Sequence, residues 1–191
     1  MDKQRLEAFS DGVIAVIITI MVLEMKTPHG VDLDALAPVL PVFLSYVLSY
    51  VYVGIYWNNH HHLFRLVEDV NGPILWANLH LLFWLSLVPF VTGWTAENHL
   101  SPWPTALYGV VLMMAGIAYY ILTHVLIRHH GEDSPLSAAI GRDFKGKLSV
   151  VLYAAAIVLS LAIPWGGVAI YVLVAIMWII PDPRVEKRID H

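Results

Sequence analysis

The chain has 191 residues, of which 58% are hydrophobic and only 14% are charged. Soluble domains average roughly 45–50% apolar and about 25% charged residues, so this composition excludes an ordinary soluble fold. The formal net charge of −4 gives no reason to expect a nucleic-acid partner. Because the chain contains no cysteine, disulfides, thiolate metal sites and cysteine nucleophiles are also excluded. These values indicate an integral membrane protein.

Long apolar runs recur along the chain, and each is close to the about 20 residues that a helix needs to cross the hydrocarbon core. They predict an all-α membrane protein in which residues 1–191 form a single transmembrane domain. The polar run Asn58–His62 is expected to end the second span, and Pro164–Gly167 predicts a tight turn between the last two. The six expected spans are residues 8–25, 35–57, 73–94, 104–127, 148–163 and 168–180.

The distribution of lysine and arginine predicts the orientation, because cytoplasmic segments are enriched in these residues. Six spans place the N-terminus, the second loop, the fourth loop and the C-terminus on one side of the membrane. Of the 11 basic residues, Lys26 alone falls on the other side. The basic residues on the first side are Lys3, Arg5, Arg65, Arg128, Arg142, Lys145, Lys147, Arg184, Lys187 and Arg188. Both ends of the chain are therefore expected in the cytoplasm.

A polar motif stands at the start of the first span, where Arg5 is followed after three residues by Phe9, Ser10 and Asp11. An ionised carboxylate inside a span costs about 2.5–3.5 kcal/mol even on a lenient insertion scale, so Asp11 is expected to be paired. Arg5 lies about 240° around the helix from Asp11, which places it poorly for this role. From the residues alone, the motif is either a polar cluster that stabilises the fold or a direct functional element.

The partners of the motif are expected among amides and imidazoles on the same side of the membrane. We expect a network between helices that joins Ser10 and Asp11 to some of these residues and holds the first helix in register. The candidates are Asn58, His61 and His62 after the second span, and Asn78 and His80 early in the third.

One face of the first helix carries a narrow apolar stripe when residues are placed at about 100° intervals. Thr19 lies on the flank of this stripe, and Asp11 lies roughly opposite. Such a face is either a packing surface or, around an axis shared by several copies, a pore wall whose apolar rings would gate by dewetting. The residues of the stripe are Phe9, Gly12, Val16, Ile20 and Leu23.

The RxxxFSD pattern at Arg5–Asp11 resembles the signature of the transmembrane protein 175 family, the potassium channels of lysosomes and prokaryotes. The resemblance is strongest over residues 5–24 and is supported by Trp57–Phe64 and Leu85–Phe90. It implies a homotetramer of six-helix subunits whose central pore is lined by the first helix of each subunit. It also implies a pore without a TVGYG filter, and this chain contains no such sequence.

The resemblance further implies hydrophobic constrictions at Val16, Ile20 and Leu23, with a layer of hydroxyl groups at Thr19. Val16 is smaller than the residues usual at that position, which leaves open which ring is narrowest. The expected function is therefore a potassium-permeable channel in a membrane, taken as a prokaryotic inner membrane, and no enzymatic activity is expected. The expected partners are other copies of the chain, lipid and K⁺, without a cofactor or a bound metal ion.

Two other function classes compete with the channel. A secondary transporter of a small solute or ion would also use polar residues within the membrane, although the chain shows no convincing internal repeat. A haem- or metal-binding membrane protein is a weaker alternative, in which His61 and His80 would ligate haem between two helices. The consecutive His60, His61 and His62 cannot converge on one ion, and His129 and His130 are expected in a solvated loop.

Overall fold

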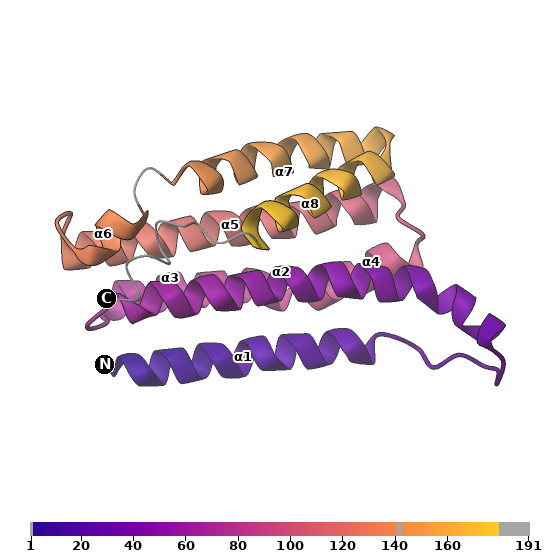
Figure 1. Ribbon diagram of the computed structural model, residues 1–191, viewed down its shortest axis with the longest axis horizontal. Helices are drawn as coiled ribbons and strands as arrows, with labels where there is room; N and C mark the ends of the chain where they lie inside the picture. The colour runs from indigo at the N-terminus through magenta and orange to yellow at the C-terminus, as the bar shows by residue number, and fades with distance from the viewer. Residues whose placement is uncertain (1, 141–142, 180–191) are drawn as a thin grey trace.

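The computed structural model describes residues 2–140 and 143–179, which form helices arranged side by side along one long axis (Figure 1). This arrangement confirms the expected all-α class. The helices are α1 (Lys3–Leu23), the 3-10 helix η1 (Leu33–Val39), α2 (Leu40–Arg65), α3 (Gly72–Ser86), α4 (Val88–Glu97), α5 (Pro102–His130), α6 (Pro135–Ile140), α7 (Phe144–Ala162) and α8 (Pro164–Ile179).

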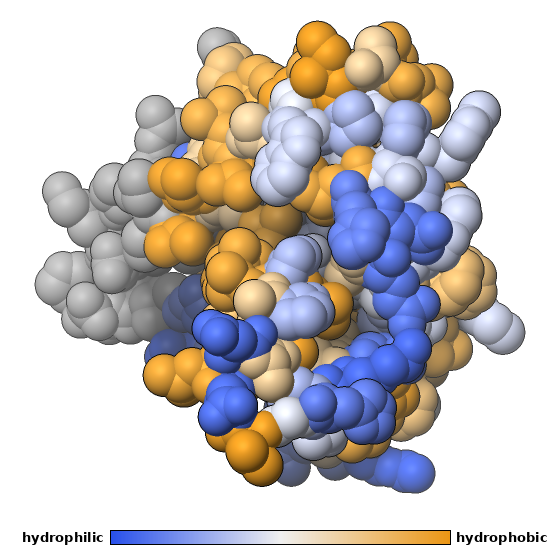
Figure 2. All heavy atoms as spheres, turned by 90° about the vertical axis from the view of Figure 1, so that its right-hand side faces the viewer, coloured by the Kyte–Doolittle hydropathy of each residue, from blue (hydrophilic) through white to orange (hydrophobic). Residues whose placement is uncertain are grey.

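Most of these helices have the length and composition of membrane spans. Five stretches in the described part of the chain qualify, and α8 is an apolar helix of 16 residues, shorter than the usual span. Figure 2 views the end of the bundle near η1 and shows hydrophilic side chains gathered in a band with apolar side chains around it. The C-terminus, expected in the cytoplasm, lies outside the described residues.

The polar run Asn58–His62 lies inside α2, whereas the sequence had indicated that the second span would end there. Polarity marks where lipid can end, but a helix ends only where its backbone is interrupted, and no glycine or proline occurs between Trp57 and Arg65. At 1.5 Å per residue, the 26 residues of α2 are about 39 Å long, which exceeds the hydrocarbon core. The histidines therefore occupy defined positions on a helix surface.

The third expected span is divided into α3 and α4 at Leu87. Pro89 cannot donate a backbone hydrogen bond, and its ring is incompatible with a regular turn after Leu85. The Leu87 amide instead donates to the Trp84 carbonyl at 3.2 Å, as in a 3-10 turn. Both α3 and α4 contact α1.

The end of the chain also departs from the expected pattern. Pro164–Gly167 forms the first turn of α8 because proline is favoured at a helix start, so the turn after α7 is reduced to Ile163. The hydrophilic stretch before α7 contains the short helix α6, which hydropathy did not indicate.

The connection between α1 and α2 contains η1 and an ion pair of 2.7 Å from Lys26 to Glu97 at the end of α4. The Glu97 carboxylate, which accepts this hydrogen bond, raises the pKa of Lys26.

The helices form a bundle in which α5 is central and α1 lies at one side (Figure 1). α5 contacts α3, α4, α7 and α8, whereas α1 contacts α2, α3 and α4. Gly109 of α5 permits close packing against α8, because a Cβ at this position would collide with the hydroxyl of Tyr171. That hydroxyl donates to the Thr105 carbonyl at 3.1 Å, and Tyr52 donates to the Tyr171 carbonyl at 2.6 Å. These contacts join α2, α5 and α8.

Candidate functional site

The α1 helix has two faces of different character. One face is buried in the bundle and consists of Leu6, Ser10, Ile14, Ile17 and Met21. The other face carries the predicted stripe, whose large side chains are exposed by 55% at Phe9, 54% at Val16, 42% at Ile20 and 79% at Leu23. Gly12, the fifth member of the stripe, is also exposed. No element of the described chain covers this stripe.

The N-terminal half of α1 is attached to the bundle through a buried chain of hydrogen bonds. The amide oxygen of Asn78 accepts from His60 Nε2 at 2.8 Å, and its amide nitrogen donates to Ser10 Oγ at 2.9 Å. Ser10 in turn donates to the Leu6 carbonyl at 2.9 Å. Since Asn78 Oδ1 can only accept, His60 carries its proton on Nε2, and every bond runs in one direction. The three side chains are at most 2% exposed and join α1, α2 and α3.

Two further contacts attach α1 to its neighbours. Asp11 lies on the exposed side of α1, where its carboxylate accepts from Trp57 Nε1 of α2 at 3.0 Å. The ammonium of Lys3 donates to the Val67 carbonyl at 2.8 Å, next to the end of α2. Asp11 is not part of the buried chain of hydrogen bonds, because it points to a different side of the helix from Ser10. Its partner is an indole and not one of the expected amides or imidazoles.

Several other motif and network candidates lie outside the buried chain. Asn58 and His61 are exposed on α2, and the His61 ring stacks on Trp57 with centroids 6.3 Å apart. His80 accepts from Trp84 Nε1 at 3.0 Å on its own helix. Each of the two rings considered as haem ligands thus contacts a tryptophan of its own helix.

The remaining motif residue, Arg5, is exposed. Within the described residues it makes no ion pair. At about 100° per residue it falls on the same side of α1 as Phe9 and Gly12. The motif thus contributes to both faces of the helix: Ser10 to the buried face, and Arg5 and Phe9 to the exposed one.

Thr19 lies beside the stripe and is exposed. Its hydroxyl donates to the backbone of the preceding turn, at 2.8 Å from the Val16 carbonyl and 3.2 Å from the Ala15 carbonyl. The hydroxyl proton is therefore directed along the helix, and the oxygen keeps lone-pair capacity on the exposed side. Such an oxygen can accept from water or contact a cation.

The two residues that sequence reasoning missed are His60 and Trp57. Placing His60 required knowing that α2 continues beyond Trp57, because the direction of its side chain follows from its helical position. Had the run been treated as helical, His60 would have aligned with the buried Tyr52, Tyr56 and Phe64 at spacings of four. That signal was present in the sequence. The partner of Asp11 could be known only from the packing of α1 on α2.

Known proteins resemble this chain in both sequence and fold. The family model for "Endosomal/lysosomal potassium channel TMEM175" matches residues 5–89, which include the motif, Trp57 and the buried chain. A potassium channel of Chryseobacterium sp. (strain P1-3) is 55% identical over 191 residues, which is 100% of both chains. The chain belongs to the TMEM175 family. A potassium channel of Streptomyces collinus is 35% identical over 150 residues, covering 74% of this chain and 73% of that one.

A solved structure of a TMEM175 homologue extends the similarity to the fold. It is the crystal structure of a lysosomal potassium-selective channel TMEM175 homologue from Chamaesiphon minutus, with a TM-score of 0.78 and 29% sequence identity. The match covers 93% of this chain and 96% of that chain. The family likeness therefore includes α7 and α8, beyond the residues that the family model matches.

Proposed function

We infer that this chain is a subunit of a potassium-permeable channel through which K⁺ crosses a membrane passively. The full-length relative and the structural neighbour are both named as potassium channels, which are not enzymes. The observation that carries the inference is the α1 stripe, which is apolar, exposed and centred about 120° around the helix from the packing face. No cofactor is needed for this role, and K⁺ is the ion that passes.

The stripe forms a pore wall only when several copies surround one axis, since one chain supplies one such helix. The proposed assembly is a homotetramer of six-span subunits in a prokaryotic inner membrane, with both chain ends in the cytoplasm. Rings of Val16, Ile20 and Leu23 would then follow one another along the axis. At 1.5 Å per residue, these rings are separated by about 6 Å and about 4.5 Å.

The proposed rings act as a hydrophobic gate. A cation loses hydration when it enters a narrow apolar ring, and no oxygen in the ring replaces the lost water. The pore at such a ring therefore conducts when it is wide enough to stay wet and stops conducting when it dewets. The hydrogen bonds of Ser10 and Asp11 keep the stripe directed away from the bundle.

Thr19 supplies the oxygen atoms that the proposed pore otherwise lacks. Thr19→Val is expected to lower potassium flux and the preference for potassium over sodium by up to about tenfold, which is about 1.4 kcal/mol. Valine keeps the shape of threonine but removes the oxygen. Thr19→Ser keeps the hydroxyl and is the control. Flux in proteoliposomes with each ion checks the prediction, and equal flux ratios in all three proteins would contradict it.

The direct test of the function is potassium flux in proteoliposomes that contain the purified chain. Potassium flux down its gradient is expected to exceed sodium flux, and choline is expected not to pass. A planar bilayer recording should show discrete current steps that scale linearly with voltage. Saturable flux coupled to a second solute, without such steps, would instead indicate a secondary transporter.

A further inference from the structure

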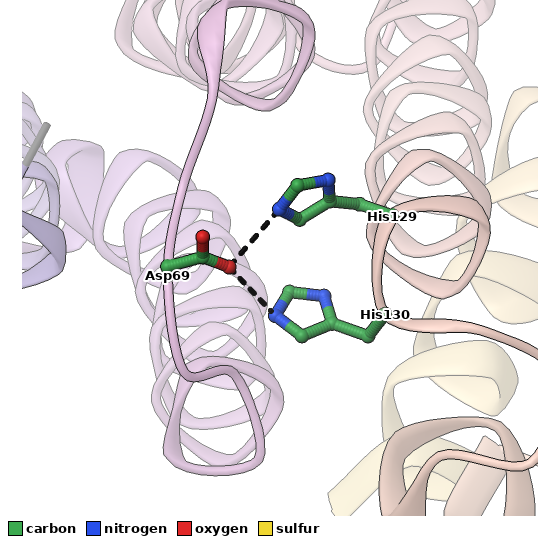
Figure 3. Close-up of side chains that lie close together, drawn as sticks. All are labelled: Asp69, His129 and His130. Carbon is green, nitrogen blue, oxygen red and sulfur yellow. Dashed lines mark hydrogen bonds and ion pairs between the residues drawn. The ribbon is translucent and has the colours of Figure 1, made fainter.

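A carboxylate and two imidazoles converge (Figure 3) at the end of the bundle opposite η1 (Figure 1). Asp69 lies in the connection between α2 and α3, and His129 and His130 are the last two residues of α5. From the sequence these histidines are expected in a solvated loop, but they lie on a helix, which ends just before Gly131 with its φ of 93°. Both rings point toward Asp69, and the three potential ligand atoms lie within 4.8 Å of one another.

The spacing of these atoms suits a tetrahedral metal ion. Asp69 Oδ1 lies 3.0 Å from His129 Nε2 and 3.5 Å from His130 Nε2. Zinc bonds of 2.0–2.1 Å at tetrahedral angles separate neighbouring ligand atoms by about 3.3 Å. We propose that Asp69, His129 and His130 form a binding site for a divalent transition metal ion such as Zn²⁺. Water would supply the fourth ligand, because the Asp69 side chain is 72% exposed.

His130 already has the tautomer that a metal ligand needs. Its Nδ1 lies 3.0 Å from the Leu126 carbonyl, which can only accept, so this nitrogen carries the proton. Its Nε2 therefore carries the lone pair, which accepts from the backbone amide of Glu68 at 3.3 Å, and a bound metal ion would take the place of this hydrogen bond. A backbone carbonyl behind the imidazole is a usual arrangement for a metal-bound histidine, because it fixes the ring and raises its basicity.

His129 has the opposite tautomer, and Asn71 is the reason. Asn71 Oδ1 caps α3 by accepting from the Ile74 amide at 3.1 Å, so its amide nitrogen faces His129 Nδ1 at 3.0 Å. His129 Nδ1 must then accept, and Nε2 carries the proton and donates to Asp69. For His129 Nε2 to bind a metal ion, this proton must move to Nδ1. There it would face the NH2 group of the Asn71 side-chain amide, which is also a hydrogen-bond donor. Asn71 therefore weakens the site without being one of its ligands.

The binding test uses the untagged full-length chain in lipid nanodiscs, titrated with Zn²⁺ in a calorimeter. One ion per subunit is expected, and Asp69→Ala and His129→Ala are each expected to weaken binding by about tenfold or more. His124→Ala is the matched control, since His124 is exposed on the same helix and bonds to the Tyr120 carbonyl. Wild-type protein that binds no Zn²⁺, or variants that bind it unchanged, would overturn the proposal.

A variant that binds Zn²⁺ more tightly would distinguish loss of the metal site from a folding defect in Asp69→Ala and His129→Ala. Asn71→Asp retains a good cap for α3 with one oxygen and can accept from His129 Nδ1 with the other. It is expected to tighten Zn²⁺ binding by about tenfold. Unchanged or weaker binding in Asn71→Asp would contradict the assigned tautomers and with them the site. None of these measurements depends on ion flux, so failure of the metal site leaves the channel proposal to its own test.

Discussion

Ile20→Ala is expected to raise the potassium flux of reconstituted channels by about tenfold, the largest effect of any single change in the stripe. Ile20 is 42% exposed on α1 and carries a branched side chain near the middle of the proposed pore wall. In a tetramer, the substitution removes three carbons from each of four side chains around the axis. The ring becomes wider and less apolar, so water and K⁺ enter more readily. Proteoliposome flux measured at equal protein density checks the prediction.

Val22→Ala provides the matched control, because Val22 is also 42% exposed but lies about 160° away around α1. It changes exposed apolar surface on the same helix without touching the stripe, and its flux is expected to equal that of the wild type. Equal effects of the two substitutions would show that exposure to lipid or to a neighbouring copy, rather than a position on the pore wall, determines the outcome. Val16→Ala should resemble Ile20→Ala, with a smaller increase because less side chain is removed.

The sequence was most informative about which residues share a face of one helix. Phe9, Val16, Ile20 and Leu23 were grouped by the 100° rule, and all four lie on the exposed side of α1. This succeeds because the helical period is a local property of the backbone. The ends of helices were less predictable, since hydropathy reports where lipid ends and not where hydrogen bonding stops. The continuation of α2 through His60 is the clearest example.

Contacts between helices were the least predictable part of the site. Ser10 and Asn78 were both singled out as polar residues that need partners, but nothing local to either indicated that His60 would complete the chain. Asp69 and His129 are 60 positions apart, and only the packing of the α2–α3 connection on α5 brings them together. Such pairings depend on the relative rotation of whole helices, which no periodicity within one helix determines.

Asn78→Ala is expected to destabilise the protein by about 2 kcal/mol, because it leaves the buried His60 donor without a partner. Asn78 is the middle member of the buried chain of hydrogen bonds, and both its amide oxygen and its amide nitrogen have partners. At a scale of about 2–4 °C per kcal/mol for a chain of this size, the unfolding temperature should fall by roughly 4–8 °C. Thermal unfolding in detergent, followed by circular dichroism, measures the change.

Asn58→Ala is the control, since Asn58 is an exposed amide on α2 near the same end of the bundle. Its unfolding temperature is expected to match that of the wild type. The double variant Ser10→Ala with Asn78→Ala should lose less stability than the sum of the losses in the two single variants, because both substitutions interrupt the same chain of hydrogen bonds. Strict additivity, or an equal loss in Asn58→Ala, would mean that the buried hydrogen bonds do not act together. Non-additivity would show that the buried face of α1 is held through Asn78, on the side of the helix away from Val16 and Ile20.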